Sequence, residues 1–373
     1  MSQLQQSRPG SSQGIRSAAM GGEYRYSNPP VIRWGQGSVA ALAGDLEQLG
    51  ARSIALVSTR SVTAEGGAAA TVLGALAQRS PVLTVLIHQH APVADIESGV
   101  MEVAASGADA IVSVGGGSPI DAGKVIAIRV GEARGTAPLR HLAVPTTLSG
   151  AELSAGAGMT DAAGNKVGLR DPRGLPDRVV YDGELALATP TWLWLSTGIR
   201  AVDHGVEGFL AGGEHPLNDV LAAEGLRRLF DSLPEAKERP AEGSIRTRNQ
   251  LGAWFSFTLP GPTAGGLSHV MGKQIGARHG IPHGVTSCLL LPHVMRYLAT
   301  VQAERMSELA RAVGVGEDGL AAAEAVEGLV RRLGLPQHIG EFGIGEHELR
   351  AAAESVAGPH PVEEIFKIYR EAL

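Results

Sequence analysis

The stretch "IVSVGGGSPIDAGKVIA" (residues 111–127) joins an apolar β-branched run to a helical pattern through three glycines. The run IVSV is typical of a buried parallel strand, and Pro119 stands where proline commonly opens a helix. Glycine lets a backbone approach a pyrophosphate closely, and free N–H groups at a helix start attract anions. The sequence therefore predicts a nucleotide phosphate site built from Gly115, Gly116, Gly117, Ser118 and Asp121.

Similar strand and helix patterns alternate on both sides of this stretch. Predicted strands lie at 53–59, 82–88, 109–117 and 141–147. Helical patterns lie at 38–50, 68–79, 93–107 and 119–130. This alternation predicts a doubly wound α/β sheet, whereas the chain after about Pro190 is helical in pattern to its end. We expect a Rossmann-like α/β domain at 23–188 and an all-helical domain at 189–373.

Composition narrows the classes of partner and location. The formal net charge of −6 argues against nucleic acid or an anionic membrane surface as a partner. No apolar run reaches the ~18 residues of a membrane span. The single cysteine, Cys288, excludes an intrachain disulfide and favours a reducing, cytoplasmic compartment, where we expect it to be a small buried side chain. Residues 1–22 are polar, without a signal-peptide core, and are predicted to be a disordered tail.

A second polar loop, "VPTTLSGAE" (144–152), follows the strand after the glycine loop. Open α/β sheets bind ligands at the carboxyl edge of the strands, so Thr146, Thr147 and Ser149 are candidates for cofactor contact. We add Lys166, as a cation for ribose or phosphate, and Thr59, at the end of the second strand. That strand ends in LVSTR without a carboxylate, so the sequence leaves the choice between NAD and NADP open.

The segment "RAVDHGVEG" (200–208) places Arg200, Asp203, His204 and Glu207 on one helix face. Two further histidines, His269 in GGLSH and His283 in IPHGV, lie on glycine-flanked segments of the helical half. A lone helical histidine is more often structural than a ligand. Three of them on such segments favour a functional site.

These motifs, GGGSPID, PTTLSGAE, GIRAVDHGVE, GGLSH and IPHGVTSCLLLPHVM in that order, resemble the iron-containing alcohol dehydrogenase family over residues 23–373. The resemblance implies a dehydroquinate synthase-like fold, NAD or NADP in the cleft, and commonly a dimer. It also implies iron or zinc held by one aspartate and three histidines. By motif, the histidines fall on His204, His269 and His283, while the aspartate position is occupied by Arg200.

An arginine in place of a carboxylate removes one ligand and repels a divalent ion. Asp203 lies about 100° around the helix from His204, so we expect it to form an i, i+3 salt bridge with Arg200 or to contact a neighbouring helix instead. The sequence predicts that no tight four-ligand metal site forms and leaves open a weak site at the three histidines. The maleylacetate reductases, a branch of the family that lacks the aspartate, are similar in KVGLRDPRGLPDRVVYDGELALATP (166–190). They typically carry asparagine at that position, so Arg200 departs from both patterns.

We therefore expect a metal-independent NAD(P)H-dependent reductase of a small oxo-acid or aldehyde. Arg200 would supply the positive charge that a metal supplies elsewhere, the three histidines would bind substrate or donate protons, and Lys273 would protonate the alkoxide. A purely structural ion pair of Arg200 with Asp203 or Glu207 is the alternative role for that arginine. The alternative functions are a metal-dependent alcohol dehydrogenase, a sugar-phosphate cyclase-type lyase and a nucleotide-binding relative without activity. EYRYSNPPVIRWGQG (23–37) offers an edge strand for pairing.

Overall fold

The computed structural model describes residues 28–76, 81–211, 215–257, 266–356 and 358–373, so the tail predicted at 1–22 lies outside the described residues. Six strands form one parallel sheet in the order β1-β8-β5-β4-β2-β3. These strands are β1 (Val31–Trp34), β2 (Ile54–Ser58), β3 (Leu83–Leu86), β4 (Ala110–Gly115), β5 (Arg140–Pro145) and β8 (Arg178–Tyr181). A separate antiparallel hairpin consists of β6 (Gly156–Thr160) and β7 (Lys166–Arg170).

Helices cover the sheet on both faces, as the alternation of patterns predicted. They are α1 (Leu42–Gln48), α2 (Arg60–Thr63), α3 (Ala68–Ala75), α4 (Val93–Ser106) and α5 (Gly117–Arg134). Two hydrophobic clusters flank the central strands, because consecutive residues of β2 and β4 point to opposite faces: Ala55 and Ile111 pack on one side, Leu56 and Val112 on the other. The predicted α/β fold is confirmed.

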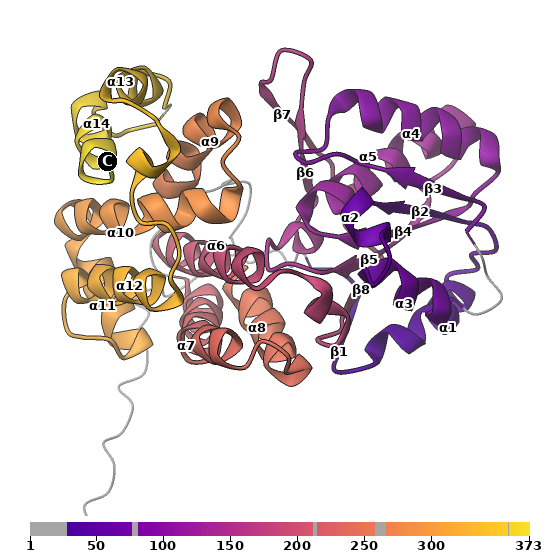
Figure 1. Cartoon of the computed structure of the whole chain (residues 1–373), viewed down its shortest axis with the longest axis horizontal. Coiled ribbons are helices and arrows are strands. Elements are labelled where there is room, and N and C mark those ends of the chain that lie inside the picture. The colour runs from indigo at the N-terminus through magenta and orange to yellow at the C-terminus, as the bar shows by residue number, and fades with distance from the viewer. Residues whose placement is uncertain (1–27, 77–80, 212–214, 258–265, 357) are drawn as a thin grey trace, which may run out of the picture.

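From Thr191 onward every regular element of the described chain is a helix. The helices are α6 (Thr191–Leu210), α7 (Pro216–Glu238), α8 (Gly243–Ser256), α9 (Leu267–His279), α10 (His283–Val301), α11 (Ala303–Val313), α12 (Gly319–Leu333), α13 (Glu346–Glu354) and α14 (Val362–Glu371). Figure 1 shows α6 running between the strand-rich part of the chain and the remaining helices. No helix of the described segments has the length and apolarity to cross a bilayer.

Helix α6 is the central element of the helical half, since each residue from Trp194 to Leu210 is buried. Helix α10 approaches it closely at Gly284, where an added Cβ would lie 2.6 Å from the carbonyl carbon of Ser196. Only glycine permits this contact. It brings His283, the neighbour of Gly284, next to the polar face of α6.

Four strand patterns named from the sequence correspond to β2, β3, β4 and β5 with ends shifted by one or two residues. The edge strand expected within 23–37 is observed as β1, whose partner in the described part of the chain is β8. The sequence analysis did not identify β8 or the hairpin. Both are short, and β7 exposes most of its residues to solvent, so neither carries the continuous apolar run of a central strand.

Candidate active site

The predicted nucleotide loops meet at one edge of the sheet. In the sheet β4 lies between β2 and β5, so the carboxyl ends that carry Thr59, Gly115 and Thr146 are neighbours. Helix α5 begins at Gly117 after an N-cap glycine, Gly116, whose position provides no capping side chain. The first N–H groups of an 18-residue helix therefore remain available to an anion at this edge.

The glycine and threonine loops lie against each other. A Cβ added to Gly116 would meet Thr147 Cγ2 at 3.2 Å, and one added to Gly117 would meet Ser149 Oγ at 3.5 Å. The Thr147 hydroxyl donates to Ser149 Oγ over 3.3 Å. The lack of side chains at both glycines thus leaves room between the loops. Thr146 is buried, and its carbonyl accepts a hydrogen bond from the Thr189 hydroxyl at 2.7 Å.

Asp121 anchors the loop region rather than pointing freely into it. Its Oδ1 accepts from Lys124 Nζ at 2.9 Å, and its Oδ2 accepts from the Gly158 backbone N–H at 2.9 Å. Lys124, which is 1% exposed, also donates to the carbonyls of Ala151 and Gly156. Sequence reasoning missed this lysine. A lysine in an apolar helix, three residues after an aspartate, is the signal that identifies such a buried anchor.

Lys166 and Thr59 lie at two other points of this region. Lys166 begins β7, and its ammonium donates to Thr160 Oγ1 at 2.9 Å. Burial lowers the pKa of Lys166; Asp121 opposes this shift by attraction and Lys273 adds to it by repulsion. Thr59 precedes α2, with its hydroxyl 3.2 Å from Ser61 Oγ, and Arg60 beside it is exposed.

On α6, Arg200 and Asp203 form a buried ion pair, as their spacing predicted. Arg200 Nη1 donates to Asp203 Oδ2 at 2.8 Å and to Ser287 Oγ at 3.2 Å. The same carboxylate oxygen accepts from the hydroxyls of Ser287 on α10 (2.6 Å) and Ser268 on α9 (3.0 Å). Three helices thus fix the carboxylate, and the carboxylate fixes the guanidinium. Because both hydrogen bonds use Nη1, the Nε and Nη2 groups have no partner within the described segments.

Glu207, on the next turn of the same face, caps α9. Its carboxylate accepts from the backbone N–H of Gly266 at 2.8 Å and of His269 at 3.0 Å. Burial and the charge of Asp203 raise the pKa of Glu207 well above its usual range, although Arg200 and the backbone N–H groups oppose this. Glu207 therefore positions His269 and is not directed toward a metal ion.

The three histidines lie close together but do not converge on one point. The rings of His269 and His283 stack with centroids 6.2 Å apart, and His204 packs edge-on against Phe257 at 4.8 Å. Burial lowers the pKa of His283 to about 3 and that of His204 well below its usual range, with Arg200 adding to both shifts. These two imidazoles are neutral at physiological pH.

Basic side chains surround His283. Repulsion by Arg200, Lys166, His90 and Lys273 contributes to its lowered pKa, in that order after burial. Burial and Arg200 also lower the pKa of Lys273, which Glu207 partly offsets. His90 is a site residue that the sequence analysis missed: its ring lies 6.4 Å from that of His283, and its backbone N–H donates to Ser118 Oγ. Lys166 and His90 from the strand half thus face Arg200 and Lys273 from the helical half.

We tested whether these residues fit a divalent metal ion. In the described ranges no group of three or more histidine, cysteine, aspartate or glutamate side chains is arranged to hold one. The position that would need a carboxylate carries the Arg200 cation, and the two nearest acids, Asp203 and Glu207, are engaged by serines and backbone N–H groups. The residues present do not fit a metal ion. Cys288 is buried, and burial raises its thiol pKa, as expected for a packing residue.

Comparisons with known proteins cover nearly the whole chain. Residues 29–183 match the family model for iron-containing alcohol dehydrogenase, and residues 194–371 match that for the C-terminal region of the Fe-containing alcohol dehydrogenase family. A maleylacetate reductase of Rhizobium sp. is 32% identical over 91% of this chain and 93% of its own length. One of Burkholderia cepacia is 30% identical over 89% of this chain and 90% of its own. The crystal structure of a maleylacetate reductase from Agrobacterium tumefaciens superposes with a TM-score of 0.82 at 28% identity, covering 94% of this chain and 97% of that one.

Proposed function

Because the chain belongs to the iron-containing alcohol dehydrogenase family and is an NAD(P)-dependent oxidoreductase, we propose that it reduces the carbonyl of a small oxo-acid without a bound metal ion. The observation that carries this proposal is the buried Arg200 guanidinium, which Asp203 orients at 2.8 Å among neutral histidines. A fixed cation here takes the role that a divalent ion has in metal-dependent relatives.

The charge around the site supports an acidic substrate. Lys166 and Lys273 add two ammonium groups to the Arg200 guanidinium, and each repels its neighbours enough to lower a pKa. A carboxylate relieves this repulsion, whereas a neutral alcohol does not. The free Nε and Nη2 edge of Arg200 matches the planar geometry of a carboxylate. Curated relatives named maleylacetate reductase support an oxo-dicarboxylate within this class.

The cofactor would lie along the carboxyl edge of the sheet. The first N–H groups of α5 at Gly117 and Ser118 would hold its pyrophosphate, while Thr59, Thr147 and Ser149 would contact it from the neighbouring loops. Asp121 and Thr146 would act indirectly, since Asp121 binds Lys124 and the Thr146 carbonyl accepts from Thr189. When bound, the reduced nicotinamide supplies the hydride.

The chain's own groups would act on the carbonyl oxygen. Arg200 would stabilise the negative charge that develops there as the carbon is reduced. Lys273, whose lowered pKa makes its ammonium a better acid, would donate a proton to that oxygen to give the alcohol and would regain one from solvent. His204, His269 and His283 would orient the substrate by hydrogen bonds, His204 and His283 as neutral imidazoles.

A direct experiment tests the proposal. Purified enzyme is assayed for NADH and NADPH oxidation with a series of oxo-acids and matched neutral aldehydes, before and after dialysis against a chelator, alongside elemental analysis. We expect substoichiometric iron and zinc, unchanged activity after chelation, and kcat/KM at least tenfold higher for the acids. Stoichiometric metal with chelator-sensitive activity would indicate a metal-dependent alcohol dehydrogenase instead.

We also propose a cytoplasmic homodimer whose subunits pair through β1, with a division into domains between residues 188 and 189. Among the described residues, edge strand β1 pairs on one side only, and its Trp34 is 55% exposed. The separate family matches at 29–183 and 194–371 support the domain boundary. Sedimentation analysis of the wild type and of Trp34→Lys tests the dimer, which the variant should weaken.

A further inference from the structure

Arg246, on α8, is a buried arginine outside the site described above. Its side chain is among the largest fully buried ones in the described chain, with 1% of the residue exposed. The guanidinium carbon lies 4.5 Å from the centroid of the Trp194 ring, which covers one face of the cation. An arginine in such a position is normally paired with a carboxylate or with several carbonyl oxygens.

Arg246 lacks such a partner. Its Nε and Nη1 atoms are buried, and neither forms a hydrogen bond in the parts of the chain that the structure describes. Burial alone lowers its pKa to about 10, with no carboxylate opposing the shift, so the group remains a cation at neutral pH. A buried cation with unsatisfied donors is costly unless a ligand or water completes it.

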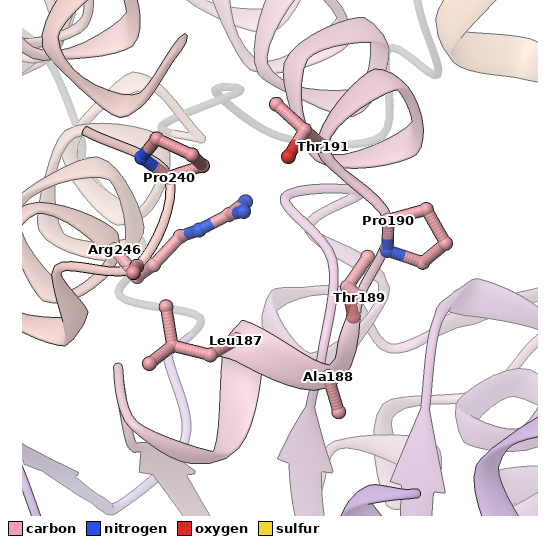
Figure 2. A pocket seen from close by; sticks show the side chains of 8 residues that line it. Leu187, Ala188, Thr189, Pro190, Thr191, Pro240 and Arg246 are labelled. Atoms are coloured by element: carbon pink, nitrogen blue, oxygen red, sulfur yellow. The ribbon is translucent and has the colours of Figure 1, made fainter. Parts of the chain in front are cut away.

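The guanidinium faces a pocket of about 410 Å³. Figure 2 shows Arg246 extending between Pro240 and Leu187, with its guanidinium directed toward the segment from Thr189 to Thr191. This pocket lies at the beginning of α6, whereas Arg200 is nine residues further along the helix, about 13 Å at 1.5 Å per residue.

The start of α6 supplies a second attraction for negative charge. Its N-cap residue, Pro190, offers no capping side chain, and no acidic residue occupies the first turn of this 20-residue helix. The first N–H groups and the positive end of the helix dipole are therefore uncompensated at the pocket wall formed by Pro190 and Thr191. The helix start and the unpaired guanidinium lie on the same pocket but on different elements, so they are independent observations.

We propose that this pocket is an anion site that binds a carboxylate or phosphate group between Arg246 and the N-terminus of α6. Carboxylates and phosphates both present negatively charged oxygen atoms, which a guanidinium group and helix N–H groups recognise. None of the residues that form the pocket belongs to the proposed catalytic or cofactor set, so this site goes beyond the proposed reductase activity.

Calorimetric titration of the full-length enzyme with inorganic phosphate, and separately with succinate, tests the proposal in the absence and presence of saturating cofactor. With cofactor bound, which fills the proposed pyrophosphate site at α5, we expect at least one of the two anions still to bind, and the tighter ligand identifies the class. The binding that Arg246→Gln removes is thereby distinguished from binding of succinate at Arg200. The Arg246→Gln variant should weaken binding at least tenfold, because it loses a charge-assisted pair. Arg248→Gln, two residues along α8 and exposed, is the matched control and should bind as the wild type does.

Because Arg246 is buried, its replacement can disturb folding, so a second variant is needed. Ala241 is exposed and lines the pocket, and Ala241→Glu places a carboxylate there without altering the core. This variant should retain the wild-type circular dichroism spectrum and lose anion binding. The proposal is overturned if neither anion binds the wild type at an anion concentration of about 10 mM. It is also overturned if saturating cofactor abolishes the binding, or if Ala241→Glu binds the anion as tightly as the wild type does.

Discussion

Arg200 and Asp203 face each other on α6 as a buried ion pair, with Nη1 2.8 Å from Oδ2 and both residues at most 5% exposed. Hydroxyls of Ser268 and Ser287 reach the same carboxylate from α9 and α10. The aspartate is therefore engaged by the guanidinium and by two serine hydroxyls. The helix spacing predicted this pair, and its geometry leaves the Nε and Nη2 edge of the guanidinium without a partner in the described chain.

Replacing Arg200 by glutamine tests this double role. A hydrogen bond to a charged group stabilises a bound ligand by about 1.5–3 kcal/mol. Its loss should therefore lower kcat/KM for an oxo-acid by about one to two orders of magnitude. The decrease in kcat/KM for a neutral aldehyde should be smaller, because an aldehyde has no carboxylate that contacts Arg200. Steady-state kinetics on the acid and aldehyde pair measures the difference, with Arg227→Gln on the exposed side of α7 as the control. Equal losses on both substrates would refute carboxylate recognition by Arg200.

Lys273 should determine the alkaline limb of the activity profile. Burial and the Arg200 charge lower the pKa of this ammonium, so it loses its proton at lower pH than an exposed lysine does. Carbonyl reduction should therefore decline as pH rises through that lowered pKa, because the proton donor disappears. In Lys273→Gln, kcat should fall about 10²- to 10⁴-fold and the remaining activity should lack this limb. A variant with the wild-type limb would show that another group donates the proton.

How far the sequence predicted this arrangement depended on the range of the contacts involved. The alternation of runs predicted β2 to β5, and the i, i+3 spacing predicted the Arg200–Asp203 pair, because both are local patterns. The partners of that pair, Ser268 and Ser287, come from positions 65 and 84 residues away from Asp203. No local pattern encodes such contacts.

The same reason explains the residues that sequence reasoning missed. His90 follows β3 and has a positive φ of 67°. Its backbone N–H donates a hydrogen bond to Ser118 Oγ, which holds His90 at the site. Lys124 lies in an apolar helix, and its role becomes clear only when the carbonyls of Ala151 and Gly156 surround it. The sequence offered Glu207 as an alternative partner of Arg200 on the same helix face, yet its hydrogen-bond partners are the N–H groups at the start of α9.

The N-terminus of α5 provides a test of the cofactor site that separates charge from shape. A side chain at Gly117 meets Ser149 Oγ at an ordinary 3.5 Å, so Gly117→Asn and Gly117→Asp should both fold normally. The aspartate adds a negative charge where the pyrophosphate is expected, and its cofactor Kd should be at least about tenfold higher than that of the asparagine variant. Fluorescence titration with NADH and NADPH measures both constants. Equal affinities would place the pyrophosphate elsewhere.

The last prediction concerns stability and Glu152, which follows the threonine loop. Its Oε1 accepts the Tyr181 hydroxyl at 2.8 Å, whereas its Oε2 is buried without a partner in the described chain. Burial raises the pKa of Glu152, although the Tyr181 hydrogen bond and Lys124 partly oppose this. The folded state therefore holds this proton more tightly than the unfolded state does.

The sign of the effect follows from that difference. Stability from this group is fully present below the ordinary glutamate pKa and is lost as pH rises through the raised pKa of the folded state. Glutamine keeps the acceptor for Tyr181 and cannot ionise, so Glu152→Gln should have a flatter dependence of unfolding free energy on pH and should gain stability relative to wild type as pH increases. Urea denaturation at pH values from about 4, near the ordinary glutamate pKa, to about 9 measures the difference. The control variant Glu97→Gln, on the exposed face of α4, should leave the pH dependence unchanged. A parallel pair of curves for wild type and Glu152→Gln would show that folding does not change the pKa of Glu152.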